Sequence, residues 1–183
     1  MRILGIPGSL RQGSHNRALL VAASELAPPS ATVEVVGLQG IPLYDGDLEA
    51  AQGLPPAVAA LKDRIAASDA LLLATPEYNS SLPGVLKNAM DWLSRPASDI
   101  PRVFGNRPLG LIGATPGPRA TQLAQAAWLP VFRTLGLRLW TGGQLNVSGA
   151  GKVFDASGAL IDPDLRERLA KYLAGFAAFV ERG

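Results

Sequence analysis

The chain has 183 residues, of which 48% are hydrophobic and 17% charged, and its formal net charge is +2. This length and composition predict one domain over residues 1–183 with a real core, and they exclude wholesale disorder. The absence of cysteine excludes a disulfide framework, a zinc ribbon, an iron–sulfur cluster and a thiol nucleophile. A single histidine excludes a multi-histidine metal site, so we expect no metal.

The sequence also limits location and partners. No run approaches the roughly 18 apolar residues that a membrane span needs. The N-terminal residues 1–6 lack the apolar core and cleavage site of a signal peptide, so we expect a cytoplasmic protein without a membrane partner. Lysines and arginines are scattered rather than clustered, which argues against a nucleic-acid partner.

In chain order, short apolar runs typical of strands alternate with helical windows. Strands are expected at residues 3–6, 32–36, 70–74, 109–114 and 137–140. Helices are expected at residues 15–27, after Pro55-Pro56, at 83–93, at 120–135 and along the C-terminal residues 165–180. Pro130 is expected to kink or interrupt the helix at 120–135.

This alternation predicts an α/β fold with a parallel sheet covered by helices on both faces, in three layers. Five strands favour the flavodoxin-like doubly wound order 2-1-3-4-5 over a six-stranded dinucleotide fold. In such sheets, ligands bind beyond the carboxyl ends of the strands at the topological switch point. The loops after the first, third and fourth strands are therefore the candidate site.

The loop after the first strand has the composition of an anion cradle. Gly8 and Gly13 permit tight turns, while a guanidinium, neutral donors and a helix N-terminus follow. The side chains that supply these donors are Ser9, Arg11, Ser14 and Asn16. Ser14 stands where a P-loop would have its lysine, so one terminal phosphate is favoured over a pyrophosphate. The alternative is an ordinary turn in which Ser14 merely caps the helix.

The loop after the third strand contains Thr75 to Gly84, with Pro76 and Pro83 stiffening its ends. Its backbone can hydrogen-bond the edge of a planar heterocycle, and Tyr78 offers a ring face. The alternative is a polar surface loop. Lys87 and Asp91 read as an ordinary i,i+4 pair rather than an acid/base dyad.

Two segments together resemble the NADPH-dependent FMN reductase family of flavodoxin-like proteins, which also contains quinone, chromate and azo-dye reductases. They are Gly8-Ser9-Leu10-Arg11-Gln12-Gly13-Ser14-His15-Asn16 and the run from Pro76-Glu77-Tyr78-Asn79 to Trp92. Residues 41–48 are similar to the family's loop after the second strand, and the likeness extends over nearly the whole chain.

The resemblance implies a set of cofactor-binding residues. Ser9, Arg11, Ser14 and Asn16 would hold the FMN phosphate, with His15 contributing its backbone. The isoalloxazine would be lined by Pro76, Glu77, Tyr78 and Asn79. The loop after the fourth strand departs from the family's longer glycine-rich run, and contacts there would come from Thr115 and Gly117.

The resemblance further implies non-covalent FMN as cofactor and NADPH as co-substrate. NADPH would give hydride to flavin N5, and two electrons would then pass to a quinone, flavin or similar acceptor by ping-pong turnover. No catalytic side chain is assigned, because flavin carries the chemistry.

A dimer or tetramer is implied as well. Leu43, Tyr44 and Leu48 lie in a loop, and Trp92 and Trp128 either leave apolar surface for a second copy or lie in the core.

Two other classes of function stay open. A flavodoxin-type carrier would shuttle single electrons between protein partners, although flavodoxins are typically strongly acidic and this chain is not. A flavin-binding scaffold with little turnover is the third reading. The physiological acceptor and the choice between NADPH and NADH are undetermined, and Arg107 and Arg119 are candidates to meet a 2′-phosphate.

Overall fold

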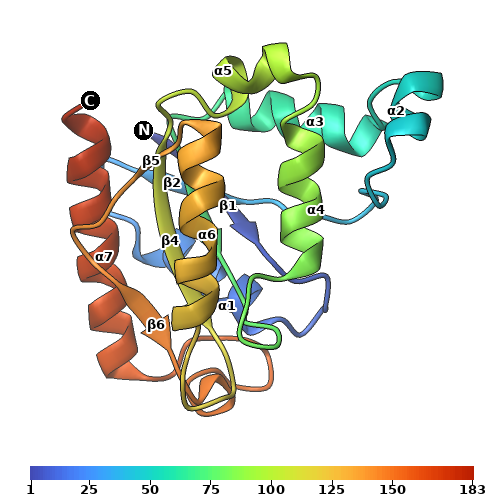
Figure 1. Ribbon diagram of the computed structural model, residues 1–183. Helices are drawn as coiled ribbons and strands as arrows, with labels where there is room; N and C mark the ends of the chain where they lie inside the picture. The colour runs from blue at the N-terminus through green and yellow to red at the C-terminus, as the bar shows by residue number, and fades with distance from the viewer.

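A parallel β-sheet forms the centre of the computed structural model, which describes all of residues 1–183 (Figure 1). Its strands are β1 (Arg2–Pro7), β2 (Thr32–Val35), β3 (Ala70–Ala74), β4 (Pro108–Ala114), β5 (Arg138–Leu139) and β6 (Leu145–Val147). The order β2-β1-β3-β4-β5, with every pairing parallel, confirms the predicted flavodoxin-like arrangement.

Helices cover both faces of this sheet (Figure 1). They are α1 (His15–Leu26), α2 (Gly46–Gln52), α3 (Pro56–Ala66), α4 (Gly84–Leu93), α5 (Ile100–Val103), α6 (Gln122–Leu135) and α7 (Pro163–Glu181). Short 3₁₀ turns occur at Ala97–Asp99 and Ala150–Lys152. The helices α1 and α7 pack on one face, and α3, α4, α5 and α6 pack on the other. None of the helices combines the length and the apolar character needed to cross a bilayer.

The central strands are buried on both sides, as their uninterrupted apolar runs predict. All five residues of β3 and all seven of β4 are buried. The sheet separates two apolar clusters of similar size, with 22 and 20 buried residues. Side chains alternate between these clusters along the central strands β1, β3 and β4, so the sheet is fixed from both faces and holds its strand-end loops in place.

The fifth position of the sheet differs from the single strand expected at residues 137–140. Two short strands share it, because β5 pairs with the start of β4 and β6 pairs with its end. Between them, the Tyr172 hydroxyl of α7 accepts a hydrogen bond from Leu111 N at 2.9 Å and donates one to Leu111 O at 3.1 Å. Burial raises the pKa of Tyr172, which keeps the hydroxyl protonated. A side chain thus replaces the missing strand partner.

Pro130 does not interrupt α6, contrary to expectation. The helix runs without a break from Gln122 to Leu135. Proline removes the hydrogen bond to the carbonyl of Ala126, four residues earlier. Ala126 and Pro130 are both exposed, so water can solvate that carbonyl. The helix begins two residues later than predicted, because Ala120 has a left-handed φ of 56°.

Replacing Tyr172 with Phe should lower the free energy of unfolding by about 1–3 kcal/mol, the cost of leaving buried polar groups unpaired. Urea denaturation followed by circular dichroism measures this change. The control is Tyr44→Phe, which removes a hydroxyl bonded to Glu49 on the surface and should change stability by less than about 0.5 kcal/mol. Equal losses in the two variants would contradict a special role for the Tyr172 hydroxyl.

Candidate functional site

Three loops meet at the carboxyl ends of the central strands. They are the first loop (residues 8–14, after β1), the second loop (75–83, after β3) and the third loop (115–121, after β4), all at the lower end of Figure 1. Gly8 N donates to Ala74 O at 2.8 Å. A Cβ at Gly8 would lie 2.9 Å from Pro76 Cδ and 3.0 Å from Leu86 Cδ2. Only glycine lets the first loop pass this close to the second.

The first loop and the start of α1 present a run of open donors. The backbone N–H groups of Gln12, Gly13, His15 and Asn16 donate to no acceptor in the protein. They lie at the positive end of the α1 dipole, where helices bind anions. The Ser14 side chain is buried and accepts from Arg17 N at 3.3 Å, so it takes the capping role that the sequence left as the alternative.

Arg11 adds an uncompensated positive charge to this region. Its exposed guanidinium makes no ion pair and no hydrogen bond within the protein, while its backbone N–H donates to Ser9 Oγ at 3.3 Å. Burial, followed by the charge of Arg11, lowers the pKa of His15. The imidazole is therefore neutral at neutral pH and stacks on Phe154, with ring centroids 6.0 Å apart. A bound anion would be neutralised by Arg11 and the helix rather than by His15.

The Asn16 side chain is hydrogen-bonded to the end of β4, although the family motif suggests that it holds a phosphate. Its side-chain Nδ2 donates to Ala114 O at 2.9 Å, and Ala114 N donates to its Oδ1 at 3.0 Å. The residue is only 3% exposed. The amide therefore joins α1 to the end of β4, and Asn16 can offer an anion its backbone N–H rather than its side chain.

The second loop is shaped by a tight two-residue turn. Tyr78 and Ser81 exchange backbone hydrogen bonds of 3.1 and 3.0 Å, and Asn79 and Ser80 between them both have positive φ. This is the geometry of a type I′ turn. The Tyr78 ring is 48% exposed, and its hydroxyl donates to Ser9 Oγ at 3.4 Å. Tyr78 therefore lies between the first and second loops.

Glu77 turns its carboxylate away from that opening. Its Oε2 accepts from Leu123 N at 2.9 Å and Ala124 N at 3.1 Å, in the first turn of α6. Sequence reasoning missed this contact, because its partners lie 46 and 47 residues away. The Oε2 atom of Glu77 is thus occupied within the protein.

The third loop is anchored to β6 and to its own first residue. Thr115 N donates to Val147 O at 2.9 Å, and Ala150 N donates to Thr115 O at 3.0 Å. The Thr115 hydroxyl accepts from Gly117 N at 3.4 Å. Thr115 and Gly117 therefore lie together, and the Asn16 contact to Ala114 connects their loop to the first.

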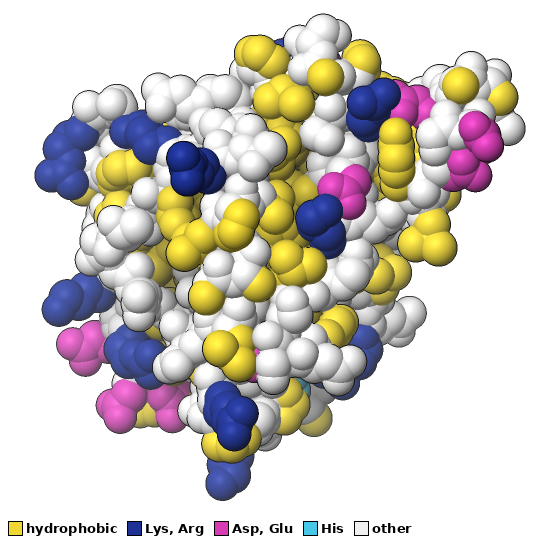
Figure 2. Space-filling model, viewed as in Figure 1, with side chains coloured by type: hydrophobic (Ala, Val, Ile, Leu, Met, Phe, Trp, Pro, Cys, Tyr) yellow, Lys and Arg dark blue, Asp and Glu magenta, His cyan; other side chains and the backbone are white.

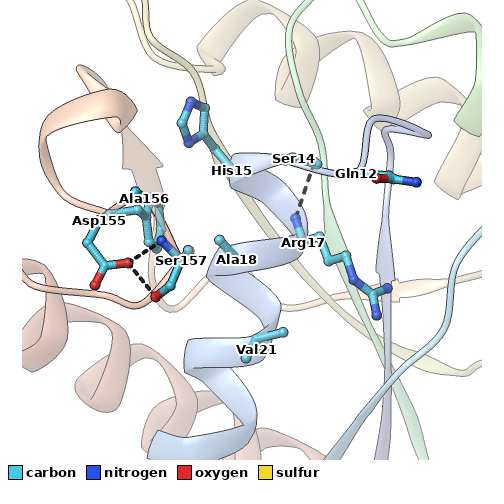
Figure 3. A pocket seen from close by; sticks show the side chains of 12 residues that line it. Gln12, Ser14, His15, Arg17, Ala18, Val21, Asp155, Ala156 and Ser157 are labelled. Atoms are coloured by element: carbon cyan, nitrogen blue, oxygen red, sulfur yellow. Dashed lines mark hydrogen bonds between the residues drawn. The ribbon is translucent and has the colours of Figure 1, made fainter.

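A hollow of about 240 Å³ adjoins the first loop (Figure 3). It lies between α1, with His15 and Ala18, and the turn that contains Asp155 and Ser157. The Asp155 carboxylate accepts from Ser157 N at 2.8 Å, from Ser157 Oγ at 2.6 Å and from Ala159 N at 3.0 Å. These bonds lower the pKa of Asp155 and tie its charge to its own turn. No sequence signal linked this turn to α1.

Of the two arginines considered for a 2′-phosphate, Arg107 has a structural role. Its guanidinium donates to the carbonyls of Val103, Arg102 and Ser68, next to the start of β4. That is the opposite end of the strand from the three loops. Arg119 lies exposed in the third loop.

No cluster of three or more His, Cys, Asp or Glu side chains is arranged to hold a metal ion.

Comparisons with known proteins agree on one family. The family model described as NADPH-dependent FMN reductase matches residues 1–152. The chain is 41% identical to an NAD(P)H-dependent FMN reductase of Pseudomonas aeruginosa, covering all of this chain and 96% of the relative. It is 36% identical to a 2-hydroxy-1,4-benzoquinone reductase of a Burkholderia species, over 98% and 96% of the two chains. A flavoenzyme NAD(P)H:acceptor oxidoreductase from Paracoccus denitrificans superimposes with a TM-score of 0.87 at 31% identity, over 99% and 97% of the two chains.

The lone histidine provides a test of the charge at the first loop. Arg11→Ala should raise the pKa of His15, because a repulsive positive charge is removed. The pKa should still stay below its ordinary 6.5, since burial is the larger cause and persists. The measurement is an NMR pH titration, in which the one imidazole gives one set of signals. Arg17→Ala is the matched control and should leave the titration unchanged. An equal shift in the two variants would refute the assignment to Arg11.

Proposed function

The chain belongs to the NADPH-dependent FMN reductase family, and we propose that it passes electrons from NADPH through bound FMN to a quinone. Membership makes the chain an FMN-dependent NAD(P)H oxidoreductase and a flavoenzyme. We propose that residues 1–183 act as one FMN-binding domain. We propose a cytoplasmic location for this protein, where NADPH is available as co-substrate.

The single observation that carries the site is the set of open donors at α1. The four unpaired N–H groups of Gln12, Gly13, His15 and Asn16, beside the unpaired Arg11, are suited to one terminal phosphate. The donor set therefore fits the phosphate of FMN. The Ser9 and Ser14 hydroxyls complete the proposed phosphate site.

The second and third loops are the proposed site of the ring system. Pro76, Glu77, Tyr78 and Asn79 would line the isoalloxazine, with Glu77 contributing through its backbone. Thr115 and Gly117 would approach from the third loop. The proposal is supported by the close packing of Gly8 against Pro76 and by the Tyr78 contact to Ser9, which bring the second loop to the first. The hydrogen bonds between Asn16 and Ala114 connect the first loop to the third.

The chain's own residues bind and orient in this scheme. When bound, FMN supplies the redox chemistry. Arg11 neutralises the phosphate and takes no part in electron transfer. The half-exposed Tyr78 ring offers a stacking surface for a planar substrate at the opening. NADPH and the quinone would use this opening in turn, which gives ping-pong kinetics, and Arg119 is the remaining candidate to meet the NADPH 2′-phosphate.

Quinones are the proposed acceptors because the chain is similar to proteins named as quinone reductases. A flavodoxin-type carrier is the less favoured function, since the matching relatives are named as reductases.

The purified protein should bind FMN non-covalently and reduce benzoquinone with NADPH. Arg11→Ala should weaken FMN binding by about 1.5–3 kcal/mol, the range for a hydrogen bond to a charged group. Fluorescence titration measures this, with Arg182→Ala at the far end of α7 as the control. Unchanged FMN affinity in Arg11→Ala would exclude Arg11 from the phosphate site. A wild-type protein that binds FMN but supports no NADPH-dependent quinone turnover would contradict the reductase function.

The proposed oligomer requires a surface other than the one expected from the tryptophans. Trp92 and Trp128 are fully buried, so of the two alternatives that the sequence left open they lie in the core. Their indole N–H groups donate to Pro42 O and Thr75 Oγ1 within the fold. Leu43, in contrast, is 83% exposed.

We propose that a second copy covers the groove between α4 and α6. Figure 2 shows apolar side chains gathered along it. Met90, Val131 and Leu135 line the groove together with the exposed Thr134, and Lys87 and Asp91 form an ion pair at its rim. A rim with one cation and one anion complements itself across a twofold axis, which favours a second copy over a charged partner.

Thr134→Glu, at an exposed residue that lines the groove, should therefore shift the protein toward monomer, because a charge would be buried in the contact. Light scattering at micromolar concentration measures the change. Ile161→Glu, at an exposed residue outside the groove, is the control and should leave the oligomer intact. A monomeric wild type would refute the proposed contact.

A further inference from the structure

The helix α6 begins without a cap from its own residues. Thr121 occupies the capping position, but its side chain makes no capping hydrogen bond. Its buried hydroxyl instead donates to Asn146 Oδ1 at 3.1 Å and accepts from Gln125 Nε2 at 3.2 Å. The first-turn N–H groups of α6 therefore need an acceptor from elsewhere.

Glu77 of the second loop supplies that acceptor. A single oxygen, Oε2, receives both Leu123 N and Ala124 N, at 2.9 and 3.1 Å. A carboxylate at the positive end of a helix is stabilised by charge-assisted hydrogen bonds and by the helix dipole. The third loop leads directly into α6, so this contact joins the second loop to the end of the third.

Thr75 makes a second contact to the same helix. Its hydroxyl accepts from the buried Trp128 Nε1 at 3.0 Å, about one turn further along α6. Residues 75 and 77 therefore both attach to α6, and Tyr78 follows immediately. Because the Thr75 contact is independent of Glu77, a change at Glu77 should loosen the second loop without unfolding the protein.

We propose that Glu77 is a positioning residue, whose carboxylate fixes Tyr78 and the second loop relative to α6 and the third loop. It thereby sets the opening in which FMN and the planar substrates would lie. The same contact keeps the negative charge of Glu77 directed at backbone N–H groups and out of the opening. This inference rests on the proposed function.

The test compares Glu77→Ala with Glu77→Gln. Alanine removes both hydrogen bonds, whereas the glutamine Oε1 can still accept both N–H groups. Losing a helix cap typically changes an equilibrium constant about fivefold. Because FMN binding would have to order the loosened second loop again, the dissociation constant for FMN should rise about fivefold in Glu77→Ala. In Glu77→Gln it should stay within about twofold of the wild type. Glu25→Gln, at an exposed and unpaired glutamate on α1, is the control for the loss of one charge.

Hydrogen exchange without FMN distinguishes positioning from simple helix capping. In Glu77→Ala, exchange should quicken both at residues 122–125 and at residues 76–82. Faster exchange confined to 122–125, with unchanged FMN affinity, would overturn the proposal. If the wild type bound no FMN, the proposed function would fail, whereas the exchange comparison would still decide whether Glu77 fixes the second loop.

Discussion

The side-chain amide of Asn16 joins the first turn of α1 to the last residue of β4 through two buried hydrogen bonds. Ala114 leads directly into the third loop, and Asn16 is the second residue of the helix that follows the first loop. The open N–H groups of the first loop are thus held at a fixed position relative to Thr115 and Gly117. Gly8, packed against Pro76, fixes the first loop to the second. A site built from three separate strand ends depends on such cross-links, because each loop alone has little to define its conformation.

The charges around the site follow one arrangement. Arg11 is left without a partner, while both nearby carboxylates are turned onto backbone N–H groups. Glu77 accepts from the start of α6, and Asp155 accepts from its own turn. His15 is neutral at neutral pH, because burial and Arg11 both lower its pKa. The positive potential at the first loop therefore comes from the exposed guanidinium of Arg11, from Arg17 in the first turn of α1 and from the helix end, which suits a ligand with a terminal phosphate.

The sequence predicted the features that local patterns determine. The apolar run of β3 and the β-α alternation were sufficient for the sheet order. The composition of residues 8–16 predicted an anion cradle, which stays a prediction and forms part of the proposed function. The contacts of Tyr172, Glu77 and Asn16 could not be predicted, because their partners lie 61, 46 and 98 residues away. A polar side chain carries no local signal of which distant backbone group it will bind. The sequence also left open whether Trp92 and Trp128 are buried, because their burial depends on helices that pack over the sheet.

The family motif from Pro76 to Trp92 combines binding with support. Its residues 76–83 belong to the second loop, but two later members hold the chain after β2. Asn88 accepts from Tyr44 N and donates to Pro42 O, and the Trp92 indole donates to the same carbonyl. These bonds hold Leu43 out in solvent beside α4, the helix that lines the proposed contact with a second copy. Because the surface of α4 is already ordered in one protomer, association would require little further loss of conformational entropy. One continuous stretch of sequence can therefore shape the cofactor site and the contact surface together.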